Sequence, residues 1–263
     1  MQPSSSTLEQ TDRSVYITDS PLRRAGILAY GLASYAAGVA ALVWIILLML
    51  GLLDFTGGPV HVENPVLAGL FDLGLLVAFA LQHSVMARAG FKARWTRLIH
   101  PSMERSSYLL ATGLVMLPVL VLWQPLPAVL WSLGSPIARG AVTGLALLGW
   151  AYLFLATFAI DHFELFGLQQ SWRGFRGKAP VPPPFRERWM YRFDRHPIMT
   201  GMLVGLWAAP TMTVGHLLFA AGLSGYIAVG VHFEERALRR QWGATYQAYR
   251  RRVATIVPLP WAR

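Results

Sequence analysis

Long apolar runs, separated by short polar segments, dominate the chain. The run Gly26–Leu53 contains no charged residue, and the run Pro65–Ala87 contains only Asp72 and His83. Three further runs are similarly apolar: 106–124, 140–160 and 197–231. Each run is close to or longer than the roughly 20 residues that a helix needs to cross the hydrocarbon core. The pattern therefore predicts an all-α, polytopic membrane protein.

Composition supports the same class of protein. Of 263 residues, 54% are hydrophobic and only 14% are charged, whereas a soluble domain carries about 25% charged residues. The chain has no cysteine, which removes disulfides, thiolate nucleophiles and cysteine-based zinc sites.

Lysine and arginine alternate between the connecting segments. The segments 54–64 and 125–137 hold none, whereas 88–105, 166–196 and the tail from Arg236 hold 5, 7 and 7. By the positive-inside rule, the basic segments and both termini lie in the cytoplasm. The net charge of +10 then faces anionic membrane lipid rather than nucleic acid.

Two cytoplasmic termini require an even number of crossings. Four full transmembrane helices and a C-terminal helical hairpin satisfy this, with five to six membrane helices in all. Pro210 interrupts the last run and predicts a turn, because proline removes a helix hydrogen bond. The expected spans are 26–53, 65–87, 106–124 and 139–165, and the hairpin comprises 198–209, a turn at 210–214 and 215–240. Residues 1–25 form a polar cytoplasmic tail, and 26–263 form a single membrane domain.

The cytoplasmic segment before the hairpin contains "KAPVPPPFRER". The prolines at 182–184 favour an extended, stiff strap. The strap is either a lid over a site or a plain connector.

Ionisable residues gather where the apolar runs meet the cytoplasm. A charged side chain within a membrane segment is unfavourable in free energy, so each such residue is a candidate for a role in function. There are four groups. The first contains His83 and Arg88, with Asp72 three helical turns before His83, and the second contains Asp161, His162 and Glu164. The third is Arg195 with His196, and the fourth contains His232, Glu234 and Glu235. Their shared depth fits one polar site at the cytoplasmic face, and it also fits polar residues that snorkel to the interface.

Other chemistries fit the sequence less well. No histidine pair has metal-ligand spacing on one helix, although axial haem ligation by two histidines stays open. The sequence contains no phosphate-binding glycine loop and no nucleophile elbow. A channel or drug carrier needs polar residues at mid-membrane, and only Asp72 offers one.

Two stretches, "YRFDRHPIMTG" and "HFEERALRRQWGATYQAYRRRV", resemble the C-terminal signature of the isoprenylcysteine carboxyl methyltransferase superfamily. The similarity covers 191–258. The matching residues are Tyr191, Arg195, His196, Pro197, Gly201, Glu234, Glu235, Leu238, Gly243, Tyr246 and Tyr249. One departure is Asp194, where the superfamily usually has an apolar residue.

The N-terminal half, with "QHSVMAR" and "MERSSYLL", resembles the branch that holds NnrU-like proteins and bacterial membrane methanethiol S-methyltransferases. "HFELFGLQQ" is more similar to the latter. This resemblance implies an S-methyltransferase that uses S-adenosylmethionine, without a metal, to convert methanethiol to dimethyl sulfide in the bacterial inner membrane. Hydrogen sulfide or other small thiols are further possible substrates.

The resemblance gives the C-terminal polar residues expected roles in holding the donor. Arg195 pairs with its carboxylate, and Glu234 or Glu235, with His232 nearby, accepts from its ammonium or ribose hydroxyls. His196 and Tyr191 contact the adenine. Pro197 begins a helix whose free N–H groups face the anion, and Gly201 keeps the next turn thin.

Methyl transfer to a thiol benefits from a base that helps to form the thiolate. His83 is the first choice, with Asp72 or Arg88 orienting it, and His162 is the second. Phe79, Phe158 and Phe166 are expected to line a small apolar thiol pocket. Two alternatives stay open: methylation of a larger lipid or prenylated acceptor, and a non-catalytic membrane factor of the NnrU type.

Overall fold

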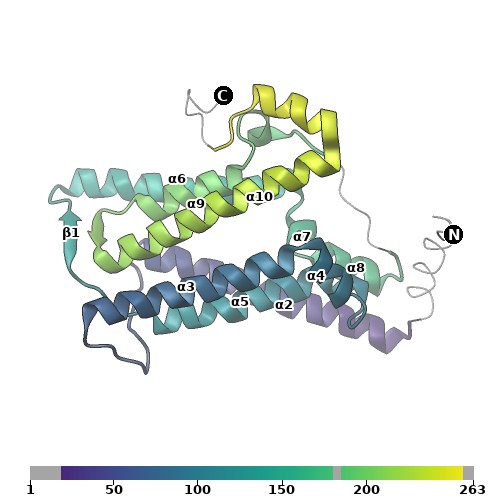
Figure 1. Cartoon of the computed structure of the whole chain (residues 1–263), viewed down its shortest axis with the longest axis horizontal. Helices are drawn as coiled ribbons and strands as arrows, with labels where there is room; N and C mark the ends of the chain where they lie inside the picture. Colours follow the sequence, from purple (N-terminus) through teal and green to yellow (C-terminus); the bar gives the residue numbers. More distant parts are fainter. Residues whose placement is uncertain (1–18, 180–184, 257–263) are drawn as a thin grey trace. The chain divides into compact units, whose positions relative to one another are not determined.

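The computed structural model describes residues 19–179 and 185–256, and it is almost entirely helical over them (Figure 1). The longer helices are α2 (Pro21–Met49), α3 (Pro65–Ala87), α5 (Glu104–Leu122), α6 (Pro136–Ile160), α9 (Pro197–Trp207) and α10 (Val214–Arg252). The shorter ones are α4 (Ala89–Trp95), η1 (Pro101–Met103), α7 (His162–Leu165), α8 (Leu168–Phe175) and η2 (Trp189–Arg192). The strands are β1 (Val129–Ser132) and β2 (Thr211–Thr213).

Within the described residues, five helices are long and apolar enough to cross a membrane: α2, α3, η1 with α5, α6 and α10. Helix α9 has 11 residues, so it extends about 16 Å, roughly half the thickness of the hydrocarbon core. The prediction of an all-α polytopic protein with four long helices and a C-terminal hairpin is confirmed.

Several helix boundaries differ from the expected ones. Helix α6 ends at Ile160 rather than at residue 165, because Asp161 leaves helical geometry and caps the separate helix α7. Helix α2 begins at Pro21 rather than at residue 26, because proline is well tolerated in the first turn of a helix. Helix α10 continues past residue 240 to Arg252, across a break in helical geometry at Gly243. The prolines at 182–184 of the expected strap lie outside the described residues.

The chain divides into two compact units. The first comprises 1–41, 82–114 and 161–184, and the second comprises 42–81, 115–160 and 185–263. The single-domain expectation stays a prediction.

In the first unit, α8 packs against η1 and α7. Ser106, on α5, and Ser171, on α8, lie 3.0 Å apart through their hydroxyl oxygens. Oδ2 of the buried Asp19 lies 3.0 Å from Nε2 of the buried His100. The contact between Ser106 and Ser171 fixes α8 beside the start of α5.

In the second unit, glycines allow α6 and α9 to approach very closely (Figure 1). A Cβ atom built on Gly201 would lie 2.5 Å from the carbonyl oxygen of Gly149, and one built on Gly149 would lie 2.8 Å from the backbone nitrogen of Gly205. Any larger side chain would overlap backbone atoms, so the short helix α9 is held by this contact.

The hairpin between α9 and α10 turns through β2, which pairs antiparallel with β1. Three carbonyl groups at or beside this turn have partners in this unit. Trp131 Nε1 donates to Ala209 O at 3.2 Å, Leu133 N donates to Pro210 O at 3.0 Å, and His216 Nε2 lies 2.8 Å from Leu206 O. Broken backbone in an apolar segment is tolerated where protein groups cover it in this way.

Candidate functional site

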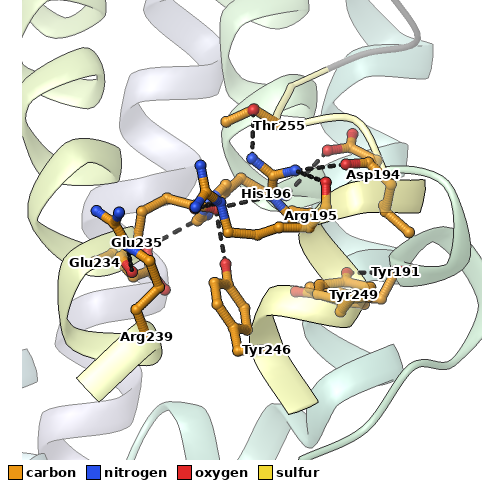
Figure 2. Close-up of polar contacts among 12 residues, drawn as sticks. Tyr191, Asp194, Arg195, His196, Glu234, Glu235, Arg239, Tyr246, Tyr249 and Thr255 are labelled. Atoms are coloured by element: carbon orange, nitrogen blue, oxygen red, sulfur yellow. Dashed lines mark hydrogen bonds and ion pairs between the residues drawn. The ribbon is translucent and has the colours of Figure 1, made fainter. Parts of the chain in front are cut away.

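The start of α9 and the middle of α10 meet in the second unit, at Glu235 (Figure 2). Oε1 of Glu235 accepts hydrogen bonds from Arg195 Nε at 2.8 Å and Tyr246 OH at 2.7 Å, and lies 3.1 Å from His196 Nε2. Arg250 Nε lies 3.0 Å from Oε2. We call Arg195, His196, Glu235, Tyr246 and Arg250 the Glu235 junction. Both oxygens of its carboxylate are already occupied by protein groups.

Arg195 is equally committed to protein acceptors. Its Nη1 donates to the carbonyl oxygens of Arg250 and Val253, and its Nη2 donates to Thr255 Oγ1 at 2.6 Å. The side chain is only 6% exposed. In this arrangement the guanidinium clamps the end of α10 and the segment after it, and it does not present the bidentate face expected for a donor carboxylate.

Glu234 differs from its neighbour because its side chain is 52% exposed. Its Oε2 lies 3.5 Å from His196 Nδ1, so both ring nitrogens of His196 face carboxylates. Burial lowers the pKa of His196, but the hydrogen bonds and negative charges of Glu234 and Glu235 outweigh it and raise the pKa to about 9. At neutral pH this side chain is therefore an imidazolium beside an exposed carboxylate.

Asp194 occupies the start of α9. Its Oδ1 accepts from the backbone N–H of His196 at 3.0 Å, and its Oδ2 accepts from Tyr152 OH at 3.3 Å. The residue is fully buried, and burial raises the pKa of its carboxyl group. Helix α9 begins at Pro197 as expected, but the group that accepts a hydrogen bond at its N-terminus is the carboxyl group of Asp194. This contact explains the acidic residue at this position.

The glycine and two tyrosines of the C-terminal signature have structural roles here. Gly243 has φ 50° and ψ −122°, a conformation that glycine adopts readily and other residues do not, and α10 changes direction there. The break allows Tyr246 to reach Glu235 and Tyr249 OH to donate to Tyr191 O at 2.6 Å. Tyr191 itself is buried.

Two predicted donor-site residues lie apart from this cluster. Gly201 makes its close approach to α6. His232 is exposed, and its ring contacts Phe233.

The first candidate base, His83, lies in the first unit. Its Nε2 is 2.6 Å from Tyr108 OH and its Nδ1 is 3.0 Å from Thr112 Oγ1. Arg88 is exposed at the start of α4. Tyr108 and Thr112 had not been predicted, and the only signal for them was their i, i+4 spacing.

Asp72 does not orient His83. It precedes His83 by 11 residues on the same helix, about 16 Å along the axis. Its buried carboxylate accepts from the backbone N–H of Gln124 at 2.8 Å in the second unit.

The second candidate base, His162, also pairs with a tyrosine: Nε2 lies 2.7 Å from Tyr35 OH. Phe166 contacts both rings. The other aromatic residues expected at the thiol pocket have different surroundings, because Phe79 packs on Tyr226 and Phe158 is 51% exposed.

Among residues 19–179 and 185–256, no group of three or more histidine and acidic side chains could hold a metal ion. The first unit contains an apolar groove of about 550 Å³, lined by Leu28, Leu32, Phe163, Leu168, Gln169, Trp172 and Arg173.

Comparison with known proteins gives matches over most of the chain. It is 43% identical over 244 residues to the methanethiol S-methyltransferase of Mycobacterium tuberculosis (strain ATCC 25618 / H37Rv), covering 91% of this chain and 98% of that one. It is 41% identical over 237 residues to the methanethiol S-methyltransferase of Pseudomonas sp. (strain GM41(2012)), covering 89% and 90%. Human Nurim is 32% identical over 186 residues, covering 67% and 71%. No protein-family profile and no solved structure matches the chain.

Proposed function

The chain belongs to the family of methanethiol S-methyltransferases, and we propose that it transfers the methyl group of S-adenosylmethionine to methanethiol, giving dimethyl sulfide. The observation that carries the proposal is the similarity to enzymes of this name over nearly the full length of both chains. The charge pattern supports a multi-pass protein that works at the cytoplasmic face, and the bacterial relatives support the bacterial inner membrane as its location.

S-adenosylmethionine supplies a methyl group on a sulfonium cation, which is reactive toward a thiolate. Glu234 fits this ligand best, because its carboxylate is half-exposed and still has acceptor capacity for an ammonium or a ribose hydroxyl. His196 lies beside it and bears a positive charge that suits the donor's carboxylate. Arg195 and Glu235 serve the site indirectly, by fixing the positions of His196 and Glu234.

A rigid donor site matters in this reaction, because displacement on a cation is accelerated mainly by aligning the thiol with the methyl group and by excluding water. The Glu235 junction ties α9, α10 and the segment after α10 together through buried, charge-assisted hydrogen bonds. We assign thiol activation to His83, with His162 as the second candidate. Phe166 is the best placed of the expected pocket residues, since it packs on His162.

The proposal is tested by incubating the purified full chain in detergent with S-adenosylmethionine and methanethiol, and measuring dimethyl sulfide in the headspace. The expected result is product that depends on both substrates. Absence of product, together with absence of donor binding by calorimetry, would overturn the enzymatic function and favour a factor of the NnrU type.

A larger acceptor has one observation in its favour, the apolar groove of about 550 Å³, which exceeds what methanethiol needs. A second assay with a prenylated thiol therefore accompanies the first, and hydrogen sulfide provides a third. Faster turnover of the prenylated thiol would assign the chain to lipid-like acceptors.

A further inference from the structure

His83, Tyr108 and Thr112 form a closed circuit of hydrogen bonds in the first unit. Thr112 Oγ1 donates its only proton to the carbonyl oxygen of Tyr108, one turn earlier on α5, at 2.8 Å. The same Oγ1 lies 3.0 Å from His83 Nδ1. Because its proton is already used, Thr112 must accept from Nδ1, which therefore carries the hydrogen.

The hydrogen on Nδ1 determines which atom donates in the contact between His83 Nε2 and Tyr108. A neutral imidazole with hydrogen on Nδ1 has an acceptor at Nε2, and Nε2 lies 2.6 Å from Tyr108 OH. The phenol is the donor there. Both ring nitrogens of His83 are thus engaged by neighbouring side chains, and a substrate cannot reach Nε2 without displacing Tyr108.

We propose that Tyr108 is the catalytic residue that meets the thiol, and that His83 acts through it as the proton acceptor. The inference rests on the proposed function, since it assumes a thiol substrate. The group that takes the proton from the thiol is then the phenol oxygen of Tyr108 rather than His83. His83 receives the phenol's own proton, and Thr112 holds the imidazole in the tautomer that can accept it.

The S–H proton of methanethiol moves to the Tyr108 oxygen as the phenolic proton moves to His83 Nε2, which becomes an imidazolium. The sulfur electron pair forms the new S–C bond, and the old C–S⁺ bond breaks with its electrons on the donor's sulfur, leaving a neutral thioether. The imidazolium then returns its proton to Tyr108, which releases one proton to water.

One feature of the circuit favours this relay. The circuit accepts a proton at Nε2 without moving any heavy atom, because the Nδ1–H to Thr112 contact is unchanged.

The test compares Tyr108→Phe with Tyr30→Phe in the full chain. Tyr30 is a matched control, since its hydroxyl donates to Ser107 at 3.0 Å in the same unit. Tyr108→Phe should lower kcat for methanethiol by about 100- to 10,000-fold, the usual range for general base catalysis, with donor binding by calorimetry unchanged. With a thiol acidic enough to be ionised at the assay pH, the loss should shrink below about tenfold. An equal loss for both thiols would overturn the relay.

A second measurement does not depend on activity. In ¹⁵N-histidine spectra, the His83 resonances, assigned through His83→Gln, should show a protonated Nδ1 and an unprotonated Nε2. The opposite tautomer would contradict the circuit. The glutamine of His83→Gln retains an acceptor for the Tyr108 phenol but cannot take up its proton. This variant should therefore also lose kcat for methanethiol and lose less for the more acidic thiol. It provides the test if Tyr108→Phe fails to fold. If wild-type protein does not methylate methanethiol at all, the proposed function fails, whereas the tautomer can still be read.

Discussion

Arg195 and Glu235 form the buried ion pair on which the C-terminal part of the chain is assembled. Nε and Oε1 are 2.8 Å apart, and both side chains are less than one tenth exposed. The pair joins the residue before α9's cap to the middle of α10, and the remaining nitrogens of Arg195 reach Val253 and Thr255. The positions of His196 and Glu234 depend on it.

Arg195→Ala should therefore abolish donor binding by collapsing the junction. Removing one partner of a buried pair leaves an uncompensated charge and costs about 3–5 kcal/mol of unfolding free energy. The melting temperature in detergent and the donor affinity should fall together. Arg252→Ala is the control, since Arg252 pairs with Glu187 while 58% exposed, and such pairs contribute about 0–1 kcal/mol. Lost donor binding with unchanged melting would show instead that Arg195 contacts the donor directly.

Glu234→Gln should separate donor binding from stability. Its carboxylate is half-exposed, so the melting temperature should fall less than in Glu235→Gln, by the part of the His196 charge that Glu234 stabilises. A hydrogen bond to a charged group contributes about 1.5–3 kcal/mol, so the donor dissociation constant should rise about 10- to 100-fold. Glu235→Gln should lower the melting temperature strongly. Unaltered donor affinity in Glu234→Gln would remove Glu234 from the site.

Stability should depend on the protonation of His196. Its pKa is about 9 in the folded chain against an ordinary value of 6.5, so the charged ring favours the folded state. This contribution is complete below about pH 6.5 and is lost as the pH rises through about 9. Melting temperatures measured from pH 6 to 10 should fall across this window, and Glu234→Gln should shift the fall to lower pH. A flat profile over the window would refute the assignment.

Gly243→Ala should destabilise the chain through backbone conformation alone. A Cβ atom at Gly243 or at Gly230 would meet nothing within 4 Å, but only Gly243 has positive φ. Holding a non-glycine residue in such a conformation costs about 1–3 kcal/mol, whereas alanine at the helical position 230 should be neutral or stabilising by up to about 1 kcal/mol. Equal melting temperatures for the two variants would contradict the break in α10.

Gly201→Ala should loosen the contact between α6 and α9. The added methyl group would lie 2.5 Å from the carbonyl oxygen of Gly149, and overpacking costs about 1–3 kcal/mol. Gly144→Ala on α6 is the control, because its Cβ would have no neighbour within 4 Å. A melting temperature for Gly201→Ala equal to that of the control would be incompatible with the close approach.

The sequence was informative where a single physical preference decides the structure. Charge-free runs of about 20 residues specify the long helices, and Pro210 places the turn of the hairpin. The pairing of Arg195 with a glutamate of α10 was also foreseeable, because buried charges need partners. These features depend on residue type and spacing alone.

The remaining features depend on backbone groups and on distance. The acceptors of Arg195 include carbonyl oxygens of Arg250 and Val253, and a carbonyl group has no signature in a sequence. Asp72 and His83 share a face of α3, yet the helical rise keeps them about 16 Å apart, and Asp72 binds Gln124 instead. The partners of His83 come from another helix, so their identity required the packing of α3 and α5.

The most direct test of the account uses S-adenosylmethionine with a trideuterated methyl group and unlabelled methanethiol. The purified wild-type chain should release dimethyl sulfide that is three mass units heavier than the unlabelled compound, and Glu234→Gln should require more donor to reach the same rate. Wild-type protein that binds neither donor nor thiol, and releases no labelled dimethyl sulfide, would contradict the account.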